Sequence, residues 1–422
     1  MPVPETQVLA GGAALVMLPI VGVNSVALTC LMPGGSAYDA EESDGTAAML
    51  SELMLRGAGS LNSRQLSDAL DRASAQRSCD VSAWHLQLAM AVTRSNLDAA
   101  LGLFGLILRE ARLPADAVDP ARSLCEQALE GIEDDPQSEV MLRLRERHAD
   151  APYHRHGYGS LRGLRGATAS SLRRAWSQRV VPGGTIIGLA GAIDTALVAQ
   201  RLRTNLGDWS GTAAEPPTTA PAPRGYLPIE REGAQVHIAA AWNAPRERDD
   251  DSVLERLAVA ILSGSSSSRL FTEVRQKRSL CYTVHAGYRP SRDHGRVTFY
   301  AGTTPQRAQE TLDVSLEQME VLRAGVTGEE FERARTLMRS GLIMQSESVP
   351  AQAALLAADY FRLGRARALS ELADRLQKVT LEQLNGYLAR RRFEGYTLVT
   401  IGPAVLESRH SAAAGASVSA SA

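Results

Sequence analysis

Apolar residues along this chain follow two different periods. Residues 23–32 and 236–242 are short, almost continuous apolar runs between turn-forming residues, which predicts buried strands. Residues 97–112 instead carry an apolar residue at every third or fourth position, which predicts an amphipathic helix. The same reasoning predicts further strands at 180–190, 296–301 and 396–401, and helices at 119–132, 195–206, 306–323 and 329–344. Both periods occur in both halves of the chain, so an α+β protein is expected.

The two halves of the chain show the same order of features. Each has an apolar strand, a turn that contains proline, a short acidic patch and then an apolar helix. This repetition predicts two homologous α+β domains, each a mostly antiparallel or mixed sheet with helices packed on one face. A Pro-rich segment at 213–223 is typical of a linker. The expected boundaries are an N-terminal domain at 1–210, a linker at 211–228, a C-terminal domain at 229–407 and a disordered, Ala- and Ser-rich tail at 408–422.

Composition narrows the classes of function. The 45 Lys and Arg residues against 47 Asp and Glu residues give a formal net charge of −2, which provides no basic surface for nucleic acid and no attraction to anionic membranes. None of the four cysteines lies in a C-x-x-C pair, which favours buried thiols in a reducing compartment. The N-terminus lacks a basic segment followed by an apolar core, so a cytoplasmic location is expected, or a periplasmic one if a signal peptide has been removed.

The segment at 34–57 combines a Gly-Gly-Ser-Ala-Tyr-Asp opening with a Met-Leu-Arg-Gly ending around an apolar helix. This order resembles the inverzincin peptidases, the family of pitrilysin, insulysin and the mitochondrial processing peptidase. Their helix carries the motif H-x-x-E-H, in which two histidines one turn apart bind zinc and the glutamate acts as a base. The matching positions here are Ala48, Ser51 and Glu52. A methyl group and a hydroxyl are not zinc ligands of the required kind, so the resemblance implies a degenerate zinc site.

The family's distal glutamate ligand is missing as well. It lies on a helix that leads into an acidic turn ending in proline, and this chain has Glu-Asp-Asp-Pro at 133–136. The ligand position is then Ala128, whereas Glu126 and Glu130 each lie two positions away and therefore on a different face of the helix. The losses on both helices together imply that this chain coordinates no metal, and no other cofactor is expected in it.

A second motif lies in the C-terminal half. Residues 268–284 resemble the family pattern SRLF-x-x-(I/V)-R-x-(K/E)-x-G-L-x-Y-x-V, with Arg275 and Tyr282 at its Arg and Tyr positions and Ser279 in place of its Gly. The resemblance implies that the Arg and Tyr face the zinc site, hold the substrate backbone and help to stabilise the tetrahedral intermediate. A guanidinium fork suits peptide carbonyls, and a phenol O–H is a preorganised donor for an oxyanion. The alternative interpretation is a surface arginine on a helix and a tyrosine that begins an ordinary strand.

The histidines are weaker candidates. A metal site formed by His148, His154 and His156 is one interpretation of their spacing. Their segment resembles the family's substrate-side loop, however, which favours a structural or substrate-contact role. His85 alternates with apolar residues on a predicted strand, which favours a hydrogen-bonded sheet residue over a metal ligand.

The resemblance therefore implies the non-metal-binding subunit of a heterodimeric zinc metallopeptidase, inactive alone. A homologous partner with an intact H-x-x-E-H would hold the zinc, and Arg275 and Tyr282 of this chain would complete its site for peptide substrates. Two alternatives keep the same fold: a scaffold like the core proteins of the respiratory bc complex, and a substrate-recognition subunit like the non-zinc chain of the mitochondrial processing peptidase. A scaffold would not need the Arg–Tyr pair, and the Gly-rich loop of the recognition subunit is not evident, so the first interpretation is preferred.

Overall fold

The computed structural model describes residues 3–408, and the chain forms two compact units. Unit 1 takes in, of the described residues, 3–131, together with 150–221 and 344–370. Unit 2 takes in 132–149, 222–343 and, of the described residues, 371–408. Each unit is thus built from separate stretches of sequence, whereas the sequence pattern predicts one continuous domain on each side of a linker. The disorder expected for 408–422 lies outside the described residues except at Ser408, which is buried.

The sheet of unit 1 is mixed and has six strands in the order β1-β2-β8-β3-β7-β6. Its strands are β1 (Glu5–Val8), β2 (Ala14–Pro19), β3 (Ser25–Pro33), β6 (Gln76–Val81), β7 (His85–Thr93) and β8 (Ile186–Gly191). β2 and β8 run parallel, and the other neighbouring pairs are antiparallel. A separate two-stranded sheet is formed by β4 (Gly57–Ala58) and β5 (Leu61–Asn62).

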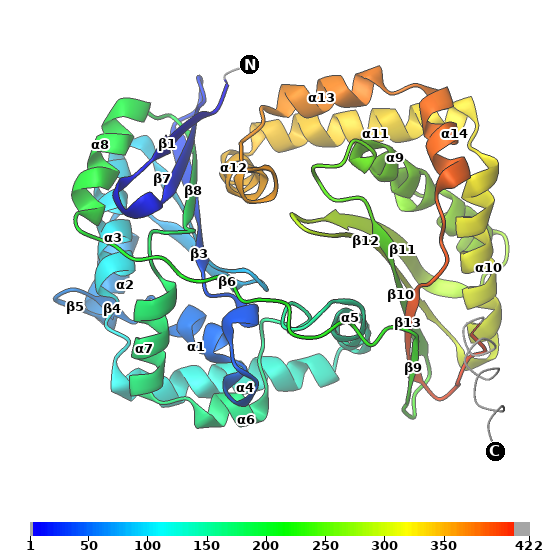
Figure 1. The fold of residues 1–422 in the computed structure, drawn as a ribbon, viewed down its shortest axis with the longest axis horizontal. Helices are drawn as coiled ribbons and strands as arrows, with labels where there is room; N and C mark the ends of the chain where they lie inside the picture. Colours follow the sequence, from blue (N-terminus) through cyan, green and yellow to red (C-terminus); the bar gives the residue numbers. More distant parts are fainter. Residues whose placement is uncertain (1–2, 409–422) are drawn as a thin grey trace. The chain divides into compact units, whose positions relative to one another are not determined.

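Helices cover both faces of the unit 1 sheet (Figure 1). They are α1 (Thr46–Leu53), α2 (Ser63–Arg72), α3 (Leu97–Glu110), α4 (Val118–Glu133), α6 (Leu161–Gly166), α7 (Ala169–Arg179), α8 (Thr195–Leu206) and α12 (Val349–Leu363). The main apolar core lies between the sheet and helices such as α1, α3 and α8. α12 packs on the opposite face, whereas the sequence pattern predicts helices on one face only. Its approach is close, because a Cβ atom on Gly188 would lie 2.3 Å from the carbonyl oxygen of Ala353.

The sheet of unit 2 has five strands in the order β11-β12-β10-β13-β9, so β11 is an edge strand. Its strands are β9 (Tyr226–Glu230), β10 (Val236–Ala244), β11 (Cys281–Pro290), β12 (Gly295–Thr303) and β13 (Thr397–Gly402). β13 and β9 run parallel, and the other pairs are antiparallel. The helices that lie wholly or mostly in unit 2 are α5 (Pro136–His148), α9 (Ser252–Ser263), α10 (Ala308–Val321), α11 (Gly328–Glu347), α13 (Leu369–Lys378) and α14 (Leu381–Arg390).

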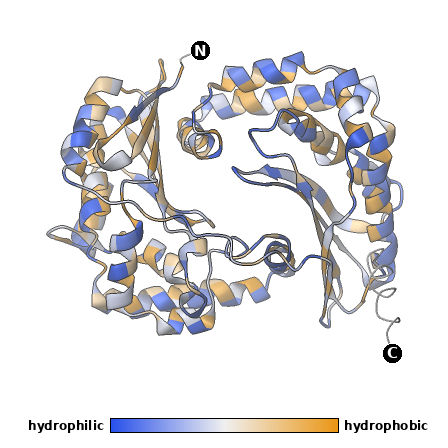
Figure 2. Cartoon of the chain, viewed as in Figure 1, coloured by the Kyte–Doolittle hydropathy of each residue, from blue (hydrophilic) through white to orange (hydrophobic). Residues whose placement is uncertain are grey.

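The two faces of the unit 2 sheet differ in what covers them. One face packs on a large core with α9, α10 and α14, in which the Trp242 indole donates to the Phe393 carbonyl at 2.7 Å. The opposite face is covered by α5 through Val140 and Leu144. Apolar residues gather on the strands and on one side of many helices in each unit (Figure 2). The two α+β domains predicted from the sequence are therefore confirmed. Separately, no helix within residues 3–408 is long and apolar enough to cross a membrane.

Candidate functional site

Helix α1, which carries the degenerate zinc motif, is positioned by a buried ion pair. The carboxylate of Asp39 accepts hydrogen bonds from the backbone N–H groups of Gly45 and Ala47, at 3.0 and 3.2 Å, where the helix begins. Arg179 of α7 donates to the other oxygen of Asp39 at 2.6 Å. Burial raises the pKa of Asp39, and the positive charge of Arg179 opposes that shift. An anion at a helix N-terminus satisfies backbone donors there, so the Asp of the Gly-Gly-Ser-Ala-Tyr-Asp opening fixes the position of α1.

The ligand-type positions on α1 lie close to α4. Ala48 is buried and Glu52 is exposed. Burial raises the pKa of Cys79 on β6 and of Cys125 on α4 to about 12, and the Glu52 carboxylate adds to both shifts, which places it near both thiols. Ala128 follows Cys125 by about one turn of α4. Glu52 of α1 and Cys125 of α4, which lie on the two helices that carry the family's zinc ligands, are thus near each other.

The residues at these positions do not fit the metal of the family. Ala48 and Ala128 present methyl groups and Ser51 a hydroxyl, so Glu52 is the one side chain of the four with a carboxylate. Across residues 3–408, no group of three or more His, Cys, Asp or Glu side chains is arranged to hold a metal ion.

Arg275 lies on a π-helix, Phe271–Gln276, directly before the edge strand β11. Its guanidinium carbon sits 5.0 Å from the centre of the Phe271 ring, and its side chain is exposed. Burial raises the pKa of Cys281 to about 11, and the charge of Arg275 opposes that shift, which places the guanidinium near the first residue of β11. Among the described residues, Arg275 makes no side-chain hydrogen bond or ion pair, so its donors are available to a ligand. π-helical turns occur frequently at functional sites.

The turn between the π-helix and β11 forms with serine in the place of the family's glycine. Ser279 adopts a left-handed backbone with φ of 51°. Its N–H donates to the Arg275 carbonyl at 3.1 Å, and the Leu280 N–H donates to the Val274 carbonyl at 3.0 Å. The Arg307 side chain donates to the Ser279 carbonyl. With serine in place of the family's glycine the turn therefore still forms, but its left-handed backbone is strained because Ser279 carries a side chain.

Tyr282 is displaced from the regular register of β11. Cys281 pairs with Thr303, but Thr283 pairs with Gly302, so Tyr282 is the extra residue of a β-bulge. A bulge redirects a side chain and commonly occurs at sheet edges and next to active sites. The Tyr282 side chain is 60% exposed, and its hydroxyl has no hydrogen-bond partner within residues 3–408. Arg275 and Tyr282 thus lie on either side of the turn that joins the π-helix to β11, and both side chains are exposed to solvent.

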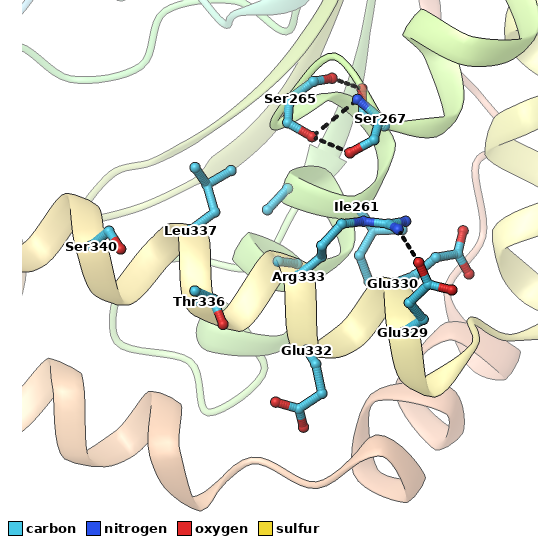
Figure 3. Close-up of a pocket in the computed structure, with 13 residues that line it drawn as sticks. Ile261, Ser265, Ser267, Glu329, Glu330, Glu332, Arg333, Thr336, Leu337 and Ser340 are labelled. Carbon is cyan, nitrogen blue, oxygen red and sulfur yellow. Dashed lines mark hydrogen bonds and ion pairs between the residues drawn. The ribbon is translucent and has the colours of Figure 1, made fainter.

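A second ion pair anchors the segment that leads to Arg275. Arg269, the arginine of the Ser-Arg-Leu-Phe motif, donates to Glu330 of α11 through Nε at 2.6 Å and Nη2 at 3.0 Å. Its hydrogen bonds, opposed by burial, lower the pKa of Glu330 to about 2. Next to this pair, a cavity of about 560 Å³ lies between the serine-rich turn and α11 (Figure 3). Ser265, Ser267 and other residues line it, but Arg275 and Tyr282 do not, so the cavity is separate from the candidate site.

The histidines singled out from the sequence do not form a cluster. His148 belongs to unit 2, where its Nδ1 lies 2.9 Å from the Thr397 hydroxyl, while His154 and His156 belong to unit 1. His85 is buried on β7, and its ring meets the Phe361 ring edge-on with centroids 4.5 Å apart. This packing is consistent with the expected role of His85 as a residue of the sheet rather than a metal ligand.

Comparison with known proteins identifies the family. The profile of the insulinase family, peptidase family M16, matches residues 22–158, and that of the peptidase M16 inactive domain matches residues 166–338. An uncharacterized zinc protease of Bacillus subtilis is 25% identical over 394 residues, which cover 90% of this chain and 94% of that protein. A similar protein of Mycobacterium tuberculosis is 24% identical over 411 residues, 95% and 93% of the two chains.

Solved structures share the fold. A peptidase M16 inactive domain from Pseudomonas fluorescens has a TM-score of 0.85 at 19% identity, covering 96% of this chain and 99% of that one. A chain of complex III2 from Candida albicans has a TM-score of 0.81 at 15% identity, covering 94% and 96%. These likenesses concern the fold alone, whereas the two family profiles together span most of the sequence. The chain belongs to the M16 peptidase family.

Proposed function

We propose that this chain is the non-metal-binding subunit of a two-chain M16 peptidase, and that Arg275 and Tyr282 act on peptides bound at the zinc centre of its partner. One observation carries the proposal: both side chains are exposed beside the start of β11, and neither has a hydrogen-bond or ion-pair partner within residues 3–408. The α1 and α4 positions that hold zinc in the family offer no ligand set here. The chain therefore has the polar half of a composite site, and the metal half belongs to another subunit.

The chemistry of the two side chains suits peptide hydrolysis. The guanidinium of Arg275 offers several donors in a fixed fork and can hold backbone carbonyls of an extended peptide. The hydroxyl of Tyr282 can donate to the oxyanion that develops when the scissile carbonyl is attacked. The bulge at Tyr282 and the π-helix at Arg275 expose the phenol and the guanidinium to solvent. The neighbouring residues Val274 and Leu280 remain buried in the core.

The experiment is reconstitution with a homologous chain that carries an intact H-x-x-E-H. The isolated chain should bind no stoichiometric zinc and should cut no peptide. The co-expressed pair should elute as one complex in size-exclusion chromatography, with an interface well above about 1,000 Å², and should cut a fluorogenic peptide. About one chelator-removable zinc per isolated chain, or a chain that stays monomeric beside such a homologue, would contradict the proposal.

A further inference from the structure

A row of polar and cationic side chains crosses the α5-covered face of the unit 2 sheet. The strand register pairs Arg289 of β11 directly with Arg296 of β12, and Arg296 with Asn243 of β10. Their neighbours Tyr288 and Val297 pack into the opposite core, so the three polar side chains share the α5 face. The connecting end of the β11–β12 hairpin is hydrophilic in Figure 2. Like charges directly opposite each other destabilise a sheet, so this arrangement requires an explanation.

More positive charge surrounds this row. Arg224 donates to the Asn243 side-chain oxygen at 3.1 Å and lies 2.7 Å from His148 Nδ1. Burial lowers the pKa of Arg145 on α5 to about 10, with Arg296 as the next cause and Glu146 opposing. These cations come from α5, β11, β12 and the segment before β9, which brings positive charge from several parts of unit 2 to one place.

The guanidinium groups of Arg289 and Arg296 have no partner among the described residues. Within residues 3–408, the side chains of Arg289 and Arg296 make no hydrogen bond and no ion pair. Arg289 is exposed and Arg296 is half-buried. Burial lowers the pKa of Arg296, and Arg289 adds to the shift. A guanidinium fork binds a carboxylate through two parallel hydrogen bonds, and partial desolvation strengthens such a pair.

We propose that Arg289 and Arg296 form a binding site for a carboxylate group of the peptide substrate. The proposal rests on the proposed function, because it extends the same peptide path along β11. Arg289 lies seven positions after Tyr282 on this edge strand, which corresponds to roughly 23 Å of extended chain. A peptide held beside β11 with its scissile bond at Tyr282 therefore presents its carboxylate about seven residues away. The carboxylate is that of an Asp or Glu side chain, or the C-terminus of the peptide.

The test measures binding of fluorescent peptides to the reconstituted pair after its zinc has been removed by chelator. Three peptides share one sequence: a neutral one with an amidated end, one with Glu about seven residues from the scissile bond, and one that ends there in a free carboxylate. Binding of one or both charged peptides should be about 10- to 100-fold tighter than that of the neutral one, as expected for charged hydrogen bonds. The charged peptide that gains affinity identifies the source of the carboxylate.

Charge reversal distinguishes this site from general attraction. Arg289→Glu alters an exposed residue and should turn the preference toward a peptide with Lys at that position. Adding Arg296→Gln should abolish the preference for carboxylate. Arg292→Glu, on the same hairpin and with the same change of charge as Arg289→Glu, is the matched control and should keep the preference for carboxylate. The tighter binding of the carboxylate-bearing peptides should also weaken with added salt.

Equal affinity of the wild-type pair for all three peptides would overturn the proposal, as would a preference that survives the double variant. The two proposals fail separately. A pair that prefers carboxylates but cuts no peptide with zinc present contradicts the proposed function alone. A pair that cuts peptides without the preference contradicts the carboxylate site alone.

Discussion

In unit 1 the Asp39–Arg179 pair positions α1, and in unit 2 the Arg269–Glu330 pair anchors the segment that leads to the π-helix. The two segments present opposite chemistry. α1 offers Ala48 and Ser51 where the family carries a metal ligand and a base. The unit 2 segment offers a guanidinium and a phenol that no other described residue engages through hydrogen bonds.

The difference separates residues that build the fold from residues for which a ligand-binding role is proposed. Asp39 satisfies backbone donors of α1, so folding alone explains its presence with or without a metal. Arg275 and Tyr282 add little to the stability of unit 2, because both are exposed and their closest described side-chain interaction is the stacking of Arg275 on Phe271. Stability does not account for them, whereas the proposed role in binding a peptide does.

The largest expected effect comes from restoring the ligands to unit 1. The quadruple variant Ala48→His, Ser51→Glu, Glu52→His and Ala128→Glu should bind about one zinc per chain, because Glu52 on α1 already lies near Cys125, about one turn before Ala128 on α4. Structural zinc sites in small peptides have apparent binding free energies on the order of 10 kcal/mol at neutral pH. Elemental analysis after gel filtration measures the outcome.

The triple variant without Ala128→Glu is the matched control and should hold zinc more weakly, since one ligand is missing. If the quadruple variant has a wild-type circular dichroism spectrum but retains no metal, then α1 and α4 do not preserve the family geometry. Unit 1 would then not contain a degenerate form of the family's zinc site.

A smaller effect tests the cation-rich surroundings of His148 in unit 2. Burial lowers the pKa of His148 to about 3, and Arg224 and then Arg296 add to the shift. The unfolded chain has an ordinary histidine pKa near 6.5, so as the pH falls it takes up this proton before the folded chain does. The free energy of unfolding should therefore fall below about pH 6.5, by up to about 1.4 kcal/mol per pH unit from this group.

Urea unfolding of the wild type between pH 7 and pH 5 measures this slope. His148→Gln should flatten it, while His156→Gln, the control, should leave it unchanged. An identical slope in wild type and His148→Gln would show that the histidine is not held neutral by burial and the neighbouring cations.

The smallest effect concerns the turn before Tyr282. Ser279→Gly should stabilise unit 2 by about 0.5–1 kcal/mol, because relief of the left-handed strain outweighs the extra entropy of glycine in the unfolded chain. The control Ser266→Gly, at a position without positive φ, should not stabilise. Denaturant midpoints measure both, and a Ser279→Gly variant less stable than wild type would mean that the turn is not strained.

Sequence patterns were enough to predict the fold class and the neighbourhood of the site. The periods at 23–32 and 97–112 report local burial, and both segments became elements of unit 1. The placement of α5 and α12 was not predictable, because an apolar stripe does not specify which sheet covers it. Segments 132–149 and 344–370 therefore joined units that a linker-based division assigns otherwise.

The candidate site was predictable only in part. Arg275 and Tyr282 were found by motif, but the π-helix and the bulge that expose them arise from hydrogen-bond registers that no residue pattern encodes. The proposed carboxylate site at Arg289 and Arg296 is not predictable from the sequence, since the pairing of these two residues depends on the register across the hairpin. The one sequence signal for them was the cluster of charged residues around the turn at 291–294.

The most direct test of the central claim is the kcat of the reconstituted pair with Tyr282→Phe. This substitution removes one hydroxyl and almost no volume, so assembly and the partner's zinc should be unchanged. The kcat should fall about 10²- to 10³-fold, or roughly 2.7–4 kcal/mol, as for loss of one oxyanion donor. Arg275→Ala should raise KM as well, and Lys277→Ala, on the same turn, should behave as wild type. Wild-type kcat in both Tyr282→Phe and Arg275→Ala would mean that this chain is a scaffold and contributes no group to catalysis.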